Sequence, residues 1–208
     1  MKRFFIPILM LLVATIGCNN AETETAKTSS TESEAVQTVA DHQAEPQVEA
    51  KVVIEKFSDY QCPACGFYFT FEKQLKQDFG DDIQIITKHF PLQQHPYAHL
   101  ASRAVEAARK QGKYHEMHEL VFAGVRQWST GNAEATFIGY AKSLGLDEAM
   151  FKADMNSADM NRIVMEQRRE GIEREIRSTP TFFINGEMLA NNPPDYETFK
   201  KIVESYLD

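Results

Sequence analysis

The sequence predicts an α/β fold that carries a helical insertion, and three observations lead to it. A strand pattern, "VVIEKF" over 52–57, runs directly into a helical pattern over 62–80. Two further strand patterns follow, one over 83–90 and one over 181–186. The long stretch between them contains only helical patterns. Alternating strands and helices around one core form an α/β layer, so the folded domain is predicted to span 50–208.

The first three elements are defined by their residue patterns. The helix over 62–80 gathers its apolar and aromatic residues on one side and ends at Gly80. The strand over 83–90, "IQIITKHF", is rich in β-branched residues and is bounded by "GDD" before it and Pro91 after it. Together they predict a strand, a helix and a second strand in close succession.

Apolar residues at three- and four-residue spacing predict the inserted helices, which lie at 98–111, 113–124, 134–145 and 157–176. They form a helical insertion over about 96–176. After the strand "TFFING", the segment 187–190 is its predicted hairpin partner. A closing helix over 194–207 is opened by Pro194 and Asp195.

The N-terminal segment is predicted to be a targeting signal rather than part of the folded domain. Lys2 and Arg3 precede an uncharged apolar run over 4–16, which is too short to span a bilayer as a helix and is typical of a signal peptide, here 1–17. Gly17 directly before Cys18 resembles the lipobox of bacterial lipoproteins, in which the cysteine is lipidated. Ordinary signal cleavage with Cys18 incidental is the alternative.

Residues 18–49 are predicted to be a flexible tether. After Cys18 they are rich in Ala, Glu, Thr, Ser and Gln, and they contain no aromatic residue. The charge of the whole chain, −8 with a pI near 5.3, argues against a nucleic-acid partner, because phosphate binding needs a basic surface. The tether would place a folded domain above a membrane that holds the lipid.

The segment "FSDYQCPACGFY" carries Cys62 and Cys65 at the junction of the first strand and the first helix. Helix N-terminal amides and the helix dipole stabilise a thiolate at Cys62, and Pro63 suits a first turn that needs no donor. Residues three apart on a helix are close enough to form a disulfide. The pair could be half of a metal site, a structural staple or a redox centre.

A metal site and a staple are both disfavoured by the sequence. Structural zinc normally takes four ligands, and with Cys18 committed to lipid no second cysteine pair remains. Histidines are crowded into one region, at His89, His95, His99, His115 and His118, but "HEMHE" matches no zinc motif, and the last two are expected to face solvent. No metal is therefore predicted. A staple closing so short a loop would add little stability.

Thiol-disulfide exchange is the third possibility, and a distant segment supports it. In "RSTPTFFING", Thr179 and Pro180 stand immediately before a strand. Proline at a strand start is often only an edge or turn residue. A cis bond there would hold an exposed backbone edge beside a reactive sulfur, and an extended substrate segment could pair with that edge.

Together, "FSDYQCPAC", "KHFPL", "HPYAHLASRAVEAARKQGKYHEMHELVF" and "RSTPTFFING" resemble the DsbA-like thiol-disulfide oxidoreductases of the thioredoxin superfamily, over about 48–208. The resemblance implies a thioredoxin-like fold with an inserted helical subdomain. It implies that Cys62 is the exposed attacking thiol and Cys65 the buried resolving thiol. It also implies that Pro180 is a cis-proline facing them and that Thr179 contacts substrate.

Two residues depart from the family pattern. Ala64 stands where strong oxidants carry a histidine, so a less extreme oxidant is expected. Lys56 stands where many relatives keep a buried carboxylate; it would either attract the thiolate or extend its ammonium to solvent. Glu55 and Asp59 are candidate proton carriers, although surface charge is the simpler role for each.

Four aromatic residues, Tyr60, Phe67, Phe69 and Trp128, are expected to line the core or a cleft. The function expected from all these features is a lipid-anchored, extracytoplasmic oxidant without a cofactor. Its partners would be thiol-containing secreted or envelope proteins and a redox partner that resets the cysteine pair. A reductase or isomerase of the same fold, and a non-catalytic binding lipoprotein, are the alternatives.

Overall fold

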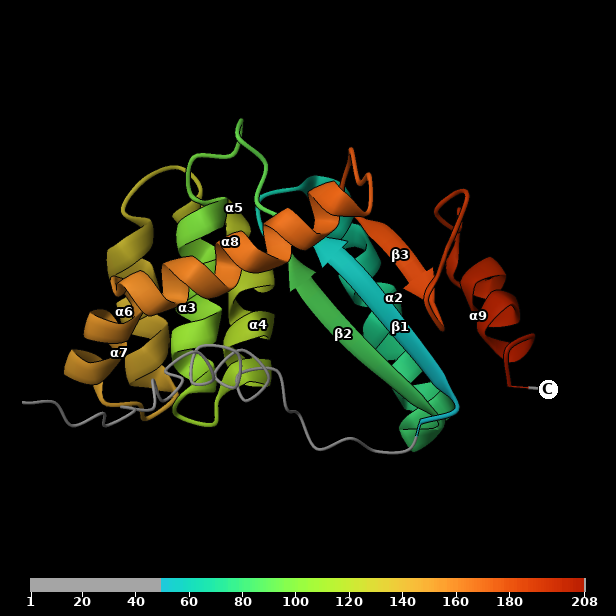
Figure 1. The fold of residues 1–208 in the computed structure, drawn as a ribbon. Coiled ribbons are helices and arrows are strands. Elements are labelled where there is room, and N and C mark those ends of the chain that lie inside the picture. Colours follow the sequence, from blue (N-terminus) through green and yellow to red (C-terminus); the bar gives the residue numbers. More distant parts are fainter. Residues whose placement is uncertain (1–49, 208) are drawn as a thin grey trace, which may run out of the picture. The chain divides into compact units, whose positions relative to one another are not determined.

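The computed structural model describes residues 50–207, and it has the predicted order of elements. Four strands form one sheet in the order β2-β1-β3-β4; they are β1 (Val52–Ser58), β2 (Ile83–His89), β3 (Thr181–Ile184) and β4 (Glu187–Met188). The central strand β1 pairs parallel with β2 and antiparallel with β3 (Figure 1). The parallel connection between β1 and β2 runs through helix α2 (Pro63–Phe79), as a βαβ unit requires.

One face of the sheet is covered by α2 and by α9 (Tyr196–Glu204). Alternate residues of β1, Val52 and Ile54, point to this face and are fully buried there. They belong to one core that also contains Leu75 of α2 and Phe199 of α9. Because α2 rests on this core along its length, its N-terminal turn is held at the end of β1.

Helix α8 (Ala158–Glu173) lies against the opposite face. Gly171 allows its close approach, because a Cβ at this position would lie 2.6 Å from the Phe90 ring and 3.0 Å from the Phe57 ring. Phe57 and Phe90 form a small core on this face with Phe183. The sheet is therefore enclosed between two helical layers, which is why β1 is buried almost throughout.

The helical insertion between β2 and β3 has its own core. Its helices before α8 are α3 (Ala98–Arg109), α4 (Tyr114–Ala123), α5 (Val125–Trp128), α6 (Ala133–Ser143) and α7 (Glu148–Met155). Trp128, Phe137 and Phe151 are fully buried among them. The predicted α/β fold, thioredoxin-like with an inserted helical subdomain, is confirmed. Helices α5 and α7 were not predicted; α7 is capped by Asp147, whose carboxylate accepts the Met150 amide at 2.8 Å.

Three local expectations are wrong. His118 is buried rather than solvent-facing, because α4 turns it toward Tyr60, whereas His115 is exposed as expected. Phe67 is 50% exposed and does not enter the core, because it lies on the outer side of α2. The hairpin partner of β3 is shorter than the predicted 187–190, although the Leu189 amide still donates to the Phe182 carbonyl.

The predicted signal peptide 1–17, the lipidated Cys18 and the tether 18–49 lie outside the described residues. Within residues 50–207 there is no helix both long enough and apolar enough to cross a membrane.

Candidate active site

The two cysteines stand where β1 passes into α2. Cys62 is the N-cap residue, with extended backbone angles (φ −72°, ψ 120°), and Pro63 opens the helix. Cys62 is partly exposed, while Cys65 in the first turn is fully buried, and its sulfur accepts the Asp59 amide at 3.4 Å. Both are free thiols. The end of the strand thus presents one accessible sulfur and covers the other.

The two thiols have opposite acidities. The pKa of Cys62 is lowered to about 5, chiefly by the hydrogen bond from the Cys65 thiol, with contributions from Thr179 and from the amides of Cys65 and Ala64, against partial burial. Burial raises the pKa of Cys65 strongly, and its hydrogen bond to Cys62 adds to this. The amides that face Cys62 are the unpaired donors of the helix N-terminus. At neutral pH Cys62 is a thiolate and Cys65 a thiol.

Thr179 and Pro180, which are far from the cysteines in sequence, lie beside Cys62. The Thr179–Pro180 peptide bond is cis, and the Cys62 sulfur lies 3.3 Å from the Thr179 carbonyl oxygen. The Pro180 carbonyl accepts the Asn192 side-chain amide at 2.8 Å, which ties this segment to the loop before α9. The folded chain therefore brings together the two segments that the sequence had singled out.

Asp59 organises the loop around Cys62, a role the sequence did not reveal. Its carboxylate is fully buried, so the expectation of a surface charge is wrong. One oxygen accepts the amides of Gln61 at 2.7 Å and Cys62 at 3.1 Å. The other accepts the Leu92 amide at 2.7 Å and the His95 Nδ1–H at 2.8 Å. A buried carboxylate with four donors is well compensated, and it fixes the backbone that aims Cys62 outward.

Lys56 does not reach solvent. Its side chain is fully buried and its ammonium pairs with Glu72 of α2, whose side chain is 7% exposed. The carboxylate that balances its charge is therefore on helix α2, and of the two alternatives for Lys56, extension of its ammonium to solvent is wrong. Glu55 points to the other face of the sheet and pairs with Arg174 at 3.0 Å, which fits the surface role expected for it.

Two further pairs of buried polar side chains are formed by His89 with Glu106 and by His118 with Tyr60. His89, the last residue of β2, is fully buried and its Nε2–H donates to Glu106 at 2.8 Å. Burial, followed by the charge of Lys56, lowers the pKa of His118 well below its usual range. The neutral ring therefore accepts the Tyr60 hydroxyl at its Nδ1, at 2.7 Å. Within residues 50–207 no three His, Cys, Asp or Glu side chains are grouped as metal ligands.

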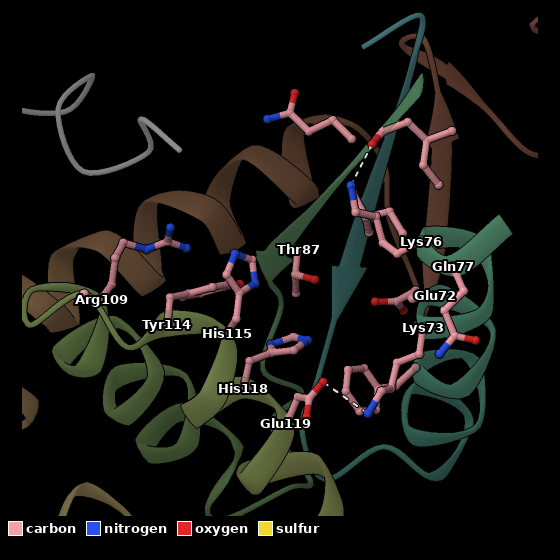
Figure 2. Close-up of a pocket in the computed structure, with 15 residues that line it drawn as sticks. Glu72, Lys73, Lys76, Gln77, Thr87, Arg109, Tyr114, His115, His118 and Glu119 are labelled. Carbon is pink, nitrogen blue, oxygen red and sulfur yellow. Dashed lines mark hydrogen bonds and ion pairs between the residues drawn. The ribbon is translucent and has the colours of Figure 1, made fainter. Parts of the chain in front are cut away.

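A pocket of about 610 Å³ opens between α2, β2 and α4. Figure 2 shows Glu72 and Thr87 on one side and His118, His115 and Tyr114 on the other. Neither cysteine lines it. The partly exposed Cys62 sulfur thus lies outside this pocket, near the start of α2, and the pocket gives access to polar residues of α2, β2 and α4 instead.

The family follows from the sequence as a whole. A family model described as thioredoxin matches residues 47–205, which include every element of the sheet and the helical insertion. The chain belongs to this thioredoxin family. Curated relatives of this thioredoxin-family protein include two named Na(+)/H(+) antiporter NhaA 1: one from Mycobacterium sp. (strain KMS), 33% identical over 67% of this chain, and one from Salinispora arenicola, 36% identical over 70%. The chain spans 22% of the length of each.

Solved structures resemble the thioredoxin-family fold described above. Oxidised BdbD from Bacillus subtilis superimposes with a TM-score of 0.68 at 22% identity, covering 76% of this chain and 89% of that one. A thioredoxin-like oxidoreductase from Silicibacter pomeroyi gives 0.63 at 22% identity, with 76% and 87% covered. The thiol-disulfide exchange protein α-DsbA2 from Wolbachia pipientis gives 0.61 at 21% identity, with 75% and 82% covered. These likenesses show a DsbA-like fold.

Proposed function

We propose that this protein is a thiol-disulfide oxidoreductase that uses Cys62 and Cys65 to oxidise secreted or envelope proteins outside the cytoplasm. The observation that carries the proposal is the asymmetry of the two thiols at the start of α2. Cys62 is accessible with a pKa lowered to about 5, chiefly through Cys65, while Cys65 is buried with a raised pKa. A stabilised, accessible thiolate is a good leaving group and makes the disulfide form oxidising.

In the oxidising direction, a substrate thiolate attacks the Cys62 sulfur of the Cys62–Cys65 disulfide. The S–S bond breaks, Cys65 leaves with the electron pair and takes up a proton, and a mixed disulfide joins substrate to Cys62. A second substrate thiolate then attacks the substrate sulfur and releases Cys62 as a thiolate. The substrate gains a disulfide and the pair is reduced by two electrons, which a separate redox partner must remove.

In the reducing or isomerising direction the same steps run backward. Cys62 attacks a substrate disulfide, and Cys65 resolves the mixed disulfide. In either direction the backbone at Thr179 and Pro180 is the proposed contact for the substrate, because it borders the Cys62 sulfur at 3.3 Å. An extended segment with a cysteine could lie along this edge by strand-like pairing.

The proposed anchor is lipid on Cys18, with 18–49 as tether and 1–17 as the removed signal peptide. Its support is the sequence pattern alone. In a bacterial host, the wild-type protein should incorporate labelled fatty acid and fractionate with membranes. Cys18→Ser should lose both properties while purified protein keeps its thiol chemistry.

The exchange function is tested by trapping. Cys65→Ala leaves Cys62 without a resolving thiol, so disulfide-linked adducts with substrate proteins should accumulate in cells and disappear on reduction. The matched control is Cys62→Ser, which keeps Cys65 but should form no adducts. Absence of adducts from Cys65→Ala, together with unchanged cellular function of Cys62→Ser, would instead support a non-catalytic binding lipoprotein.

A further inference from the structure

Two buried polar atoms at the ends of β1 and β2 have no nitrogen or oxygen hydrogen-bond partner within residues 50–207. They are the Ser58 hydroxyl and the His89 Nδ1, on side chains that are 2% and 0% exposed. Buried polar atoms are nearly always paired, because an unpaired one loses its water without compensation. Two such atoms on register partners of neighbouring strands, one of them beside a proposed redox pair, call for a chemical explanation.

The sheet places both side chains on one face. Ser58 and His89 are register partners in the parallel β1–β2 pair, so their Cα atoms lie about 4.8 Å apart. Two residues earlier, Lys56 and Thr87 are also register partners. Lys56 pairs with Glu72 of α2, and Thr87 lines the same pocket as Glu72 (Figure 2). Since strand side chains alternate, Ser58 and His89 also point to the α2 side.

Cys65, in the first turn of α2, is the thiol that faces Ser58. The Ser58 hydroxyl lies beside its thiol and is among the groups that lower its pKa, although burial outweighs them and raises it strongly. Besides the Cys62 thiol, the Asp59 amide is a further contact, at 3.4 Å from the sulfur. An amide cannot accept a proton. The proton that Cys65 exchanges in each catalytic cycle therefore needs another carrier, and the hydroxyl can both accept and donate.

His89 is poised to accept that proton. Its Nε2–H donates to Glu106, and Nδ1 is left as the ring nitrogen without a partner among residues 50–207. Burial alone would raise the pKa of Glu106, but the hydrogen bond and charge of His89 and the guanidinium of Arg109 lower it below its usual value. An ionised Glu106 stabilises a protonated His89. The Arg109 guanidinium donates to Glu106 at 2.9 Å, and Arg109 also lines the pocket. The pocket therefore connects the His89–Glu106 pair to solvent.

Other titratable groups also face His89. His99 of α3 and His118 of α4 both interact with its charge. The Tyr60 ring, from the loop before α2, lies 5.9 Å from the His89 ring. From α8, the uncharged Gln167 accepts the His89 backbone amide at 2.6 Å. Glu106 is thus the acidic partner that the described contacts give to the His89 ring.

We propose that Ser58 and His89 carry the proton of Cys65 during disulfide exchange. This inference rests on the proposed function. When Cys65 resolves a mixed disulfide, its S–H proton passes to the Ser58 oxygen as the hydroxyl proton passes to His89 Nδ1. The Cys65 thiolate then attacks Cys62, and the substrate sulfur leaves with the electron pair. In the oxidising direction the protonated His89 returns the proton to the departing Cys65 thiolate. Hydrogen bonds of this kind often close only in the reacting complex.

The test uses the full-length protein with Cys18→Ser, so that Cys62 and Cys65 are its remaining thiols, in reduced form with Ellman's reagent in stopped flow. The first thionitrobenzoate is released when Cys62 attacks the reagent, and the second when Cys65 attacks the resulting mixed disulfide. Ser58→Ala is expected to slow the second phase by about tenfold or more, while the first phase stays within about twofold. Ser58→Thr keeps a hydroxyl and should restore the second phase. A purely structural effect of the alanine would not separate the phases in this way.

His89→Gln tests the other end of the path. The glutamine amide can still donate to Glu106, but it cannot carry a proton at neutral pH. The second phase should slow by a similar factor, and it should lose the slowing in deuterium oxide that proton transfer through His89 gives the wild-type protein. Lys142→Gln is the control, because the Lys142 side chain is 75% exposed on α6 and does not line the pocket, and it should behave as wild type.

The results separate this inference from the proposed function. A second phase of wild-type rate in both Ser58→Ala and His89→Gln would overturn the proton path while leaving exchange intact. A wild-type protein that releases no second thionitrobenzoate would overturn the proposed function itself. If His89→Gln does not fold, the comparison of Ser58→Ala with Ser58→Thr decides the matter.

Discussion

Replacing Glu72 by Gln removes the carboxylate that pairs with the buried ammonium of Lys56. Lys56 is fully buried and the Glu72 side chain is 7% exposed, so water cannot take over the role of the lost charge. The glutamine keeps the shape and a hydrogen-bond acceptor. The Phe122 ring, 5.1 Å from the ammonium, remains as a second contact. The variant therefore isolates the loss of a compensating charge.

The expected cost follows from this geometry. Removing one partner of a buried ion pair typically destabilises a protein by about 3–5 kcal/mol. The retained acceptor and ring place Glu72→Gln near the lower end, at about 3 kcal/mol. For a domain of this size that corresponds to a fall in Tm of about 6–12 °C. The double variant Lys56→Met with Glu72→Leu removes both charges, and it should restore wild-type stability to within about 1 kcal/mol or exceed it.

Urea denaturation and thermal melts of the reduced full-length protein measure both variants. Asp78→Asn is the control, because Asp78 pairs with Lys200 at 2.6 Å on the surface and solvent screens that pair. It should shift the midpoint far less than Glu72→Gln. If Glu72→Gln lowers the Tm by less than about 2 °C, or the double variant is as unstable as the single one, Lys56 is not held as a buried charge compensated by Glu72.

Three further outcomes are expected. In the reduced protein the rate of Cys62 alkylation should rise with pH and reach half of its plateau near pH 5, because the hydrogen bond from Cys65 chiefly lowers the pKa of Cys62 to about 5. A midpoint near pH 8 would contradict this. Because that value lies below the ordinary 9.0, the thiolate stabilises the folded reduced protein fully above pH 9, and this contribution is lost as the pH falls through 5. Ala64→His should stabilise the thiolate further and raise the reduction potential by about 30 mV for each unit of pKa lost, measured against glutathione; a lower potential would argue against it. Gly171→Ala should destabilise the protein in urea by about 1–3 kcal/mol, because its Cβ would press on the Phe90 ring; an unchanged midpoint would mean that α8 shifts freely.

Much of the fold could be predicted because its signals are local. Strand β1 and helix α2 carry their periodicity within a few residues, and the turn residues between elements mark the boundaries. Helix α7 was missed for a physical reason. It has eight residues, too few turns to establish a helical period, and it is held mainly by the burial of Phe151 and Met155 against neighbouring helices.

The site was predictable only in part. The cysteines and Thr179–Pro180 stand in short motifs, whereas the charge partners that surround them are set by folding. Lys56 meets Glu72 sixteen residues away, and Asp59 meets His95 thirty-six residues away. No local pattern specifies such a partner. The burial of His118 was missed similarly, since Tyr60 from the loop before α2 and Phe69 of α2 pack against it, and neither lies on its own helix.

The reduction potential of the Cys62–Cys65 pair tests the central claim most directly. The measurement equilibrates the protein with graded glutathione mixtures and quantifies the two forms by mass spectrometry. A Cys62 pKa of about 5, lowered chiefly by Cys65, lies between those of thioredoxin, about 7, and DsbA, about 3.5. The pair should therefore titrate reversibly by two electrons, at a potential between about −270 and −120 mV. A pair that does not titrate, or one at or below about −270 mV, would contradict the role of an oxidant.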